Sequence, residues 1–278
     1  MSKLVYFFLL LAGCSACGDK SVLKARPPTE YNILGDVSLA SSRHTKLGIP
    51  TSNLPEILIS RQQYLLSYNN KNRDLNWVAW ELKNEDFGNI KRTDKFSLDP
   101  DLTFAHIDAV SNDEYINSCF DRGHQTPSAD RTASQVDNEV TFYMSNMLPQ
   151  TAYLNRVIWL SLENEERRIV REENKTIYIY AGPIFENDKK IGPNKDIKVP
   201  TKNFKIIADE YGKVLAAAIM PNITSTGLDP FEDHVQACKD SHSVRPTVEK
   251  KANAWQQYKS SLMDIQKLSG IDFGFIND

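Results

Sequence analysis

The sequence Asp121-Arg122-Gly123-His124 is followed, thirty-one positions after His124, by the run Asn155-Arg156-Val157-Ile158-Trp159-Leu160-Ser161-Leu162-Glu163. This combination favours metal-assisted cleavage of a phosphodiester. A histidine takes a proton from water near neutral pH, and an amide oxygen holds a hard cation without neutralising its charge. Neither residue is informative alone, so the interpretation depends on the motifs around them.

Several further motifs occur in order on both sides of these residues. They are Tyr64-Leu65-Leu66-Ser67-Tyr68-Asn69, Asn76-Trp77-Val78-Ala79-Trp80, Ser145-Asn146-Met147-Leu148-Pro149-Gln150, Tyr180-Ala181-Gly182-Pro183-Ile184, Val199-Pro200 and Pro221-Asn222. With them the sequence resembles the DNA/RNA non-specific endonucleases, which include secreted bacterial sugar-non-specific nucleases and mitochondrial endonuclease G, over about two thirds of its length. The resemblance implies a ββα-metal active site, in which a hairpin and a helix hold a catalytic metal ion.

The composition is that of an ordinary globular protein. Of the 278 residues, 41% are hydrophobic and 25% are charged, so we expect one domain that buries its own core without cross-links. The net charge is −3, so no overall basic field indicates nucleic-acid binding. A catalytic groove needs only local cations, and an enzyme that must release its product is poorly served by many phosphate contacts.

The N-terminus reads as a targeting segment. Lys3 precedes an apolar run from Leu4 to Ala12, which is too short to span a bilayer because a helix needs about twenty residues. Leu11-Ala12-Gly13-Cys14 resembles the bacterial lipobox, so we expect cleavage before Cys14, lipidation of Cys14 and attachment to a membrane. By resemblance to lipoprotein sorting signals, Ser15 after the cysteine favours the outer membrane, and the alternatives are a periplasmic or extracellular location. The expected segments are a lipoprotein signal peptide (1–13), a lipidated arm (14–55) and the endonuclease domain (56–278).

The four cysteines permit different interpretations. Cys14 and Cys17 form a C-x-x-C motif, but a signal run and a polar spacer flank it, whereas a redox motif needs a folded βαβ unit. Cys119 and Cys238 are well separated, and outside the cytoplasm they form either a disulfide or two buried thiols.

The pattern of apolar residues predicts an α+β fold with a mixed, largely antiparallel sheet. Short β-rich runs, separated by turn-forming residues, predict strands at 56–60, 64–68, 76–82, 113–120, 139–145, 176–180, 204–208 and 213–220. From 151 to about 172 the period becomes helical, with an inward stripe of Leu154, Ile158, Leu162 and Ile169. A closing helix is expected from about 248 to 268, ended by Gly270.

The predicted helix also carries a polar line. Asn155, Trp159, Glu163 and Arg167 lie four residues apart and therefore share one face, distinct from the apolar stripe. Such a line is typical either of a solvated face with a Glu163–Arg167 ion pair or of a metal-bearing helix that faces a nucleic acid. The resemblance favours the second interpretation.

The resemblance also implies roles for individual residues. His124 is the expected general base, and Asn155 the direct protein ligand of Mg²⁺, for which Mn²⁺ substitutes. Hydrolysis of DNA and RNA then leaves 5′-phosphate ends. Supporting roles fall to Glu163 (waters around the metal), Asn146 (active-site asparagine), Arg122 or Arg167 (phosphate) and Arg92 (the family's upstream arginine).

Other residues favour structural roles. His44, His106, His234 and His242 form no zinc-binding motif in the sequence, and Trp77 and Trp80 alternate with apolar residues as core side chains do. No motif for reading bases occurs, so contacts to phosphate and sugar are expected. The sequence specifies neither an inhibitor protein nor an oligomeric state.

Two other functions are compatible with the same residues. One is a non-catalytic nucleic-acid-binding surface lipoprotein of this fold, because a fold does not guarantee an activity. The other is a phosphodiesterase that acts on a substrate other than a polynucleotide. The presence of both His124 and Asn155 favours an active nuclease.

Overall fold

The computed structural model describes residues 33–245 and 253–278. The strands are β1 (Ile33–Gly35), β2 (Thr51–Ser52), β3 (Ile57–Ser60), β4 (Leu65–Asn69), β5 (Asp74–Leu82), β6 (Asp121–His124), β7 (Met147–Gln150), β8 (Ile177–Ile184), β9 (Lys190–Ile191), β10 (Ile197–Lys198), β11 (Lys202–Asp209), β12 (Val214–Pro221) and β13 (Ile271–Asp272). The helices are α1 (Pro100–Phe104), α2 (Gln135–Val140), a π-helical segment (Leu154–Trp159) that continues as α3 (Leu160–Glu173), α4 (His234–Ser243) and α5 (Leu262–Ser269).

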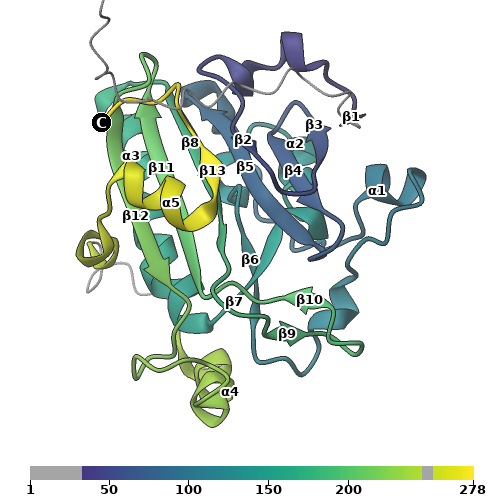
Figure 1. The fold of residues 1–278 in the computed structure, drawn as a ribbon. Helices are drawn as coiled ribbons and strands as arrows, with labels where there is room; N and C mark the ends of the chain where they lie inside the picture. The colour runs from purple at the N-terminus through teal and green to yellow at the C-terminus, as the bar shows by residue number, and fades with distance from the viewer. Residues whose placement is uncertain (1–32, 246–252) are drawn as a thin grey trace, which may run out of the picture. The chain divides into compact units, whose positions relative to one another are not determined.

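A seven-stranded sheet organises the described body, in the order β1-β3-β4-β5-β8-β11-β12 (Figure 1). Only the β1–β3 pair is parallel, and the other neighbours in this sheet are antiparallel. The expected α+β class with a mixed, largely antiparallel sheet is therefore confirmed. Separate from this sheet, β6 pairs with β7, β9 with β10, and β2 with β13.

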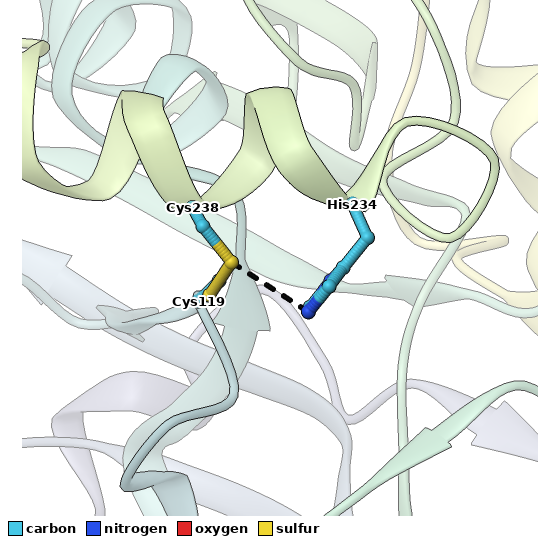
Figure 2. Close-up of side chains that lie close together, drawn as sticks. All are labelled: Cys119, His234 and Cys238. Atoms are coloured by element: carbon cyan, nitrogen blue, oxygen red, sulfur yellow. Dashed lines mark hydrogen bonds between the residues drawn. A yellow bond between two sulfur atoms is a disulfide. The ribbon is translucent and has the colours of Figure 1, made fainter.

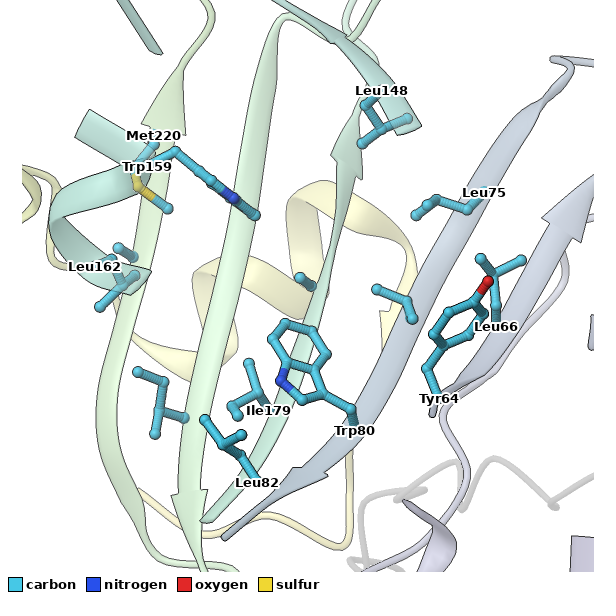
Figure 3. Packing of buried hydrophobic residues seen from close by; sticks show 14 of the residues in the cluster. Tyr64, Leu66, Leu75, Trp80, Leu82, Leu148, Trp159, Leu162, Ile179 and Met220 are labelled. Carbon is cyan, nitrogen blue, oxygen red and sulfur yellow. The ribbon is translucent and has the colours of Figure 1, made fainter. Parts of the chain in front are cut away.

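The sheet is buried on both faces, because α3 covers one face and α5 with the C-terminal residues covers the other. Trp80 packs on the α3 side with Trp159 and Leu162, as Figure 3 shows. Trp77 belongs to the opposite cluster, with Phe204. Both Trp77 and Trp80 are completely buried, which confirms the expectation that they are core residues. The inward stripe predicted for the helix is also buried.

The segments nearest the two ends differ from the sequence expectation. Residues 33–55 were expected to belong to an arm, yet β1 pairs with β3 and the buried ring of His44 accepts a hydrogen bond from Glu81 N at 3.0 Å. The expected helix 248–268 is a 3-10 turn, Ala254–Tyr258, followed by the separate α5, and residues 246–252 lie outside the described part. Gly270 ends α5 with a φ of 72°, as expected. Within the described ranges no helix is long and apolar enough to span a membrane.

Two predicted strands are replaced by other structure. Instead of a strand at 113–120, a 3-10 helix spans Asn112–Tyr115, closed by reciprocal hydrogen bonds between Ser111 and Glu114. Instead of a strand at 139–145, the end of α2 (Gln135–Val140) is followed by a turn and a 3-10 helix, Met144–Asn146. The N-cap of α2 is Ser134, whose hydroxyl accepts a hydrogen bond from Asp137 N. Hydrogen bonds between side chains and the nearby backbone favour these helical turns over pairing with a neighbouring strand.

Candidate active site

Strands β6 and β7 and the helix Leu154–Glu173 form a unit that we call the ββα unit. β6 pairs with β7 in antiparallel register, with Asp121 opposite Gln150 and His124 opposite Met147. Gly123 has to be small, because a Cβ there would lie 2.1 Å from Gln150 Oε1. The chain then turns at Thr151, whose hydroxyl accepts a hydrogen bond from Leu154 N at 3.1 Å and starts the helix.

Side-chain hydrogen bonds from Asn155, Arg156 and Trp159 hold the helix against β6. Asn155 Nδ2 donates to Asp121 Oδ2 at 2.8 Å, and Trp159 Nε1 donates to the backbone oxygen of His124 at 3.1 Å. One helical turn therefore runs beside one strand, and the two residues predicted to carry the chemistry lie on adjoining elements. The turn is π-helical, a widened form that is frequent at functional sites.

His124 is enclosed by aromatic rings. Its ring contacts Phe142 edge-on at 4.7 Å between centroids and Phe96 at 5.7 Å, and the residue is only 6% exposed. Nε2 is buried and has no hydrogen-bond partner among the described residues. Burial, and then the charges of Arg92 and Arg122, lower the pKa of His124 well below its ordinary value of 6.5. The imidazole is therefore uncharged at neutral pH and able to accept a proton.

The two arginines flank this histidine through the same rings. The Arg122 guanidinium lies 4.1 Å from the Phe96 ring centroid and donates to Asn112 Oδ1. The Arg92 guanidinium lies 4.8 Å from the Phe142 ring centroid and donates to Ser128 Oγ at 3.1 Å. Each ring that contacts His124 thus also carries a cation, so the surroundings of the imidazole are positively charged.

The amide of Asn155 is oriented by a carboxylate. Asp121 accepts hydrogen bonds only, so the NH₂ end of Asn155 must face it, and Asn155 Oδ1 is left without a hydrogen-bond partner among the described residues. A neutral amide oxygen suits a hard cation such as Mg²⁺, which prefers oxygen ligands and keeps several waters. The Asn155 amide oxygen therefore fits the predicted ion as its one direct protein ligand.

Comparison with known proteins decides the family. The sequence profile described as DNA/RNA non-specific endonuclease matches residues 40–274. The chain belongs to the DNA/RNA non-specific endonuclease family. The resemblance inferred from the motifs is therefore confirmed, and this protein is a nuclease, a hydrolase.

Individual relatives support this assignment of the endonuclease. A nuclease of Nostoc sp. is 33% identical over 270 residues, which cover 95% of this chain and 88% of the relative. Human mitochondrial endonuclease G is 34% identical over 190 residues, 63% of each chain. A crystal structure of an EndoG/EndoGI complex matches with a TM-score of 0.64 at 22% identity, over 85% of this chain and 91% of that chain, and it shows the shared fold.

Glu163 and Arg167 of this endonuclease lie further along the same helix. Arg167 Nη1 donates to the buried Asp130 Oδ1 at 3.0 Å, and its Nη2 lies 3.7 Å from Glu163 Oε2. Burial raises the pKa of Glu163, an effect that Arg167 and Lys205 oppose. The Glu163–Arg167 pair expected for a solvated face is present, but both side chains are largely buried, 12% and 11% exposed.

Asn146 of the endonuclease is engaged entirely with backbone. Its Oδ1 accepts from Thr126 N at 2.9 Å, and its Nδ2 donates to the carbonyl oxygens of Thr126 and Thr141, both at 2.9 Å. The amide is completely buried. It therefore fixes the loop that follows His124 and does not extend into the site.

The structure adds residues that the sequence did not single out. Phe96 and Phe142 enclose His124, and Arg156 pairs with Asp121 through Nη2 and Oδ1 at 2.6 Å. A fully buried ion pair, Lys205–Glu166 at 3.2 Å, joins β11 to α3. The position of Arg156 next to Asn155 could have indicated its role from the sequence. The contacts of Phe96 and Phe142 with His124 depend on tertiary structure and have no such local indication.

Cys119 and Cys238 form a disulfide, with 4.7 Å between their Cα atoms (Figure 2). His234 lies one helical turn before Cys238, with Nε2 3.6 Å from Cys238 Sγ. These three residues bring their ligand atoms within 4.8 Å of one another, but the two sulfurs are bonded to each other and are not thiolate ligands. This cluster therefore does not offer a set of metal ligands while the disulfide is intact.

Proposed function

We propose that this protein is a Mg²⁺-dependent endonuclease that hydrolyses DNA and RNA without sequence preference and leaves 5′-phosphate ends. The observation that carries the proposal is the pairing of an uncharged imidazole at His124 with an anchored amide at Asn155 on the adjoining helix. Family membership supports the nuclease activity.

His124 is the general base in this proposal. Its low pKa keeps the imidazole uncharged at neutral pH, so that one ring nitrogen carries no proton and is able to accept one. The ring takes a proton from the water that attacks phosphorus, a role that accounts for about 100- to 10,000-fold in rate. Phe142 and Phe96 hold the ring plane so that its orientation does not have to be set during the reaction.

The other residues act on the phosphate and on the ion. Arg122 and Arg92 offer N–H donors to the non-bridging oxygens, where negative charge grows in the transition state. Asn155 would hold Mg²⁺ through Oδ1, and Glu163 would orient waters bound to the ion. When bound, Mg²⁺ or Mn²⁺ stabilises charge on the phosphate and on the departing 3′ oxygen.

We also propose that the protein acts outside the cytoplasm from a lipid anchor at Cys14. Lys3, the apolar run and the lipobox-like Leu11–Cys14 support this proposal, and these residues lie outside the described part. The expected result for Cys14→Ser is loss of lipid labelling and release from the membrane fraction, with cleavage retained. If Cys14→Ser stays membrane-bound and labelled, the anchor assignment is wrong.

The test of the nuclease proposal is cleavage by purified protein that lacks residues 1–17. Supercoiled plasmid and RNA are each incubated with Mg²⁺, with Mn²⁺ and with a chelator, and the product ends are mapped. We expect both substrates to be cut with either ion and neither with chelator. His124→Ala and Asn155→Ala should each lower the rate by at least about 100-fold.

Two substitutions serve as matched controls. His106→Asn changes an exposed histidine with a φ of 57°, a conformation that asparagine tolerates, and Asn70→Ala changes an exposed asparagine in a turn. Both should cut at the normal rate. Cleavage that survives His124→Ala and Asn155→Ala would refute the mechanism, and nucleic-acid binding without cleavage would instead support a non-catalytic module.

A further inference from the structure

Helix α4 buries little of its own surface. Only Ala237 and Asp240 within it are buried, and Val235 is 67% exposed. Asp240 accepts hydrogen bonds from the N and Oγ atoms of Ser225, both at 2.7 Å, so these bonds join α4 to the loop that leads into it. A helix with so little buried apolar area depends on specific links for its position.

Two such links connect α4 to the ββα unit, and we call them together the α4 attachment. The first is the Cys119–Cys238 disulfide, which reaches the chain two residues before Asp121 (Figure 2). The second is Arg156, whose Nη1 donates to Ser241 O at 3.0 Å and to Val244 O at 2.8 Å. Arg156 thereby satisfies carbonyls at the C-terminal end of α4, where a cation is also favoured by the helix dipole.

The same guanidinium continues to the predicted metal ligand. Arg156 Nε and Nη2 donate to the two carboxylate oxygens of Asp121 at 2.8 and 2.6 Å, a two-pronged ion pair. Asp121 Oδ2 also accepts the hydrogen bond from Asn155 Nδ2 at 2.8 Å. A continuous series of contacts therefore runs from the end of α4 through Arg156 and Asp121 to the Asn155 amide.

We propose that Arg156 is a positioning residue and that the α4 attachment makes the affinity of the Asn155 site for a divalent cation dependent on the Cys119–Cys238 disulfide. The proposal rests on the assignment of Asn155 as the metal ligand. With the disulfide intact, α4 presents its carbonyls to Arg156. Arg156 then holds Asp121, and Asp121 directs Asn155 Oδ1. Without the disulfide, the α4 attachment keeps only the Arg156 hydrogen bonds, and Arg156 is less restrained.

The redox step requires a dithiol reductant. One thiolate of the dithiol attacks Cys119 Sγ, the Cys119–Cys238 bond breaks, and Cys238 leaves as a thiolate beside His234, whose imidazole lies 3.6 Å away. The second thiol of the reductant displaces Cys119. Two electrons and two protons end on the two cysteines as thiols, and the dithiol becomes a cyclic disulfide. Both cysteines are partly exposed, so a small dithiol has access to them.

The experiment measures Mn²⁺ binding to the full-length, oxidised protein by electron paramagnetic resonance of the free ion, beside cleavage rates and thermal unfolding. Arg156→Gln should weaken Mn²⁺ binding about tenfold, the scale found for residues that orient metal ligands. Arg156→Lys keeps the charge and should restore part of the affinity. The matched control is Arg168→Gln, which removes an ion-paired arginine from the exposed side of α3 and should leave Mn²⁺ affinity unchanged.

The disulfide is tested with Cys119→Ser/Cys238→Ser and with the same pair of changes in Arg156→Gln. The serine pair should weaken Mn²⁺ binding several-fold alone and add almost nothing once Arg156 is glutamine, because both changes act through one series of contacts. Loss of a cross-link that closes 119 residues also lowers the unfolding temperature, and that effect should persist in both backgrounds. Affinity and global stability are thereby separated.

The outcomes distinguish this proposal from the function on which it rests. If Asn155→Ala leaves Mn²⁺ affinity unchanged, the metal assignment itself fails. If Asn155→Ala abolishes binding while Arg156→Gln binds Mn²⁺ normally, the metal assignment holds and the positioning role of Arg156 is refuted. If the serine pair weakens Mn²⁺ binding equally in both backgrounds, the disulfide does not act through Arg156, and the proposed redox dependence is refuted.

Discussion

The two halves of the active site are held by different forces. In the His124 half, two aromatic rings enclose an imidazole that makes no internal hydrogen bond through Nε2. In the Asn155 half, the amide is fixed by a carboxylate that an arginine fixes in turn. Packing therefore orients the proposed base, whereas charged hydrogen bonds orient the proposed ligand.

The difference follows from what each residue has to do. A base must be uncharged before it accepts a proton, and burial beside two guanidiniums lowers the pKa of His124. An amide that holds a cation must present its oxygen, and anchoring the nitrogen end achieves this. Substitutions in one half should therefore leave the property of the other half unchanged.

The largest effect on stability is expected for Asn146→Ala, because Asn146 supports the backbone of the His124 half. It would leave Thr126 N and the carbonyls of Thr126 and Thr141 without their partner in a buried loop, and should lower the free energy of unfolding by about 4 kcal/mol. Urea denaturation measures it. The control Asn203→Ala removes a buried amide that has no hydrogen bond to the described residues, so its cost should be much smaller. If both variants lose the same free energy of unfolding, the Asn146 hydrogen bonds do not stabilise the protein.

Asp121→Asn should have the next largest effect and should be confined to the Asn155 half. The substitution keeps the size of the side chain but removes the charge that pairs with Arg156. We expect about tenfold weaker metal activation. The rate at saturating Mg²⁺ should change by less than about threefold, because the base is untouched. Titration of cleavage against Mg²⁺ gives both values, and a large fall in the saturated rate would contradict the separation of the halves.

The sequence allowed the sheet and the helix to be predicted, because their signals are local. β3, β4 and β5 are short runs rich in apolar residues, and Leu154, Ile158 and Leu162 repeat on a helical period. His124 and Asn155 were found through the order of the motifs, and the fold then brought their elements together. These features need no knowledge of which distant segments meet.

The remaining features depend on contacts between distant segments. Phe96 and Phe142 have no local property that marks them as walls of a histidine pocket. α4 lacks a continuous apolar stripe, and its position depends on a disulfide and on Arg156 instead of on buried apolar side chains. Sequence reasoning therefore missed the parts of the site that long-range contacts create.

A smaller effect is expected for Phe142→Leu, which loosens the His124 half only. The buried ring is replaced by a smaller side chain, so the free energy of unfolding should fall by about 1–2 kcal/mol. The cleavage rate should fall about threefold as the imidazole gains freedom, with unchanged metal activation. Phe204→Leu, on the other face of the sheet, should cost similar stability without changing the rate. If both variants cleave equally well, packing does not orient the base.

The most direct test of the electrostatic argument is the pH at which the acid limb of the pH profile begins, which is expected to shift only slightly. Burial is the main cause of the low pKa of His124, and the charges of Arg92 and Arg122 lower it further. The wild-type kcat/KM should therefore remain on its plateau below pH 6.5 and decline only when the imidazole is protonated. Removing a nearby positive charge raises the pKa, so Arg122→Gln should move the decline to higher pH, while Arg168→Gln should not. If the acid limb of Arg122→Gln stays in place or moves to lower pH, Arg122 does not lower the pKa of His124. The position of Arg122 near the imidazole would then serve phosphate binding alone.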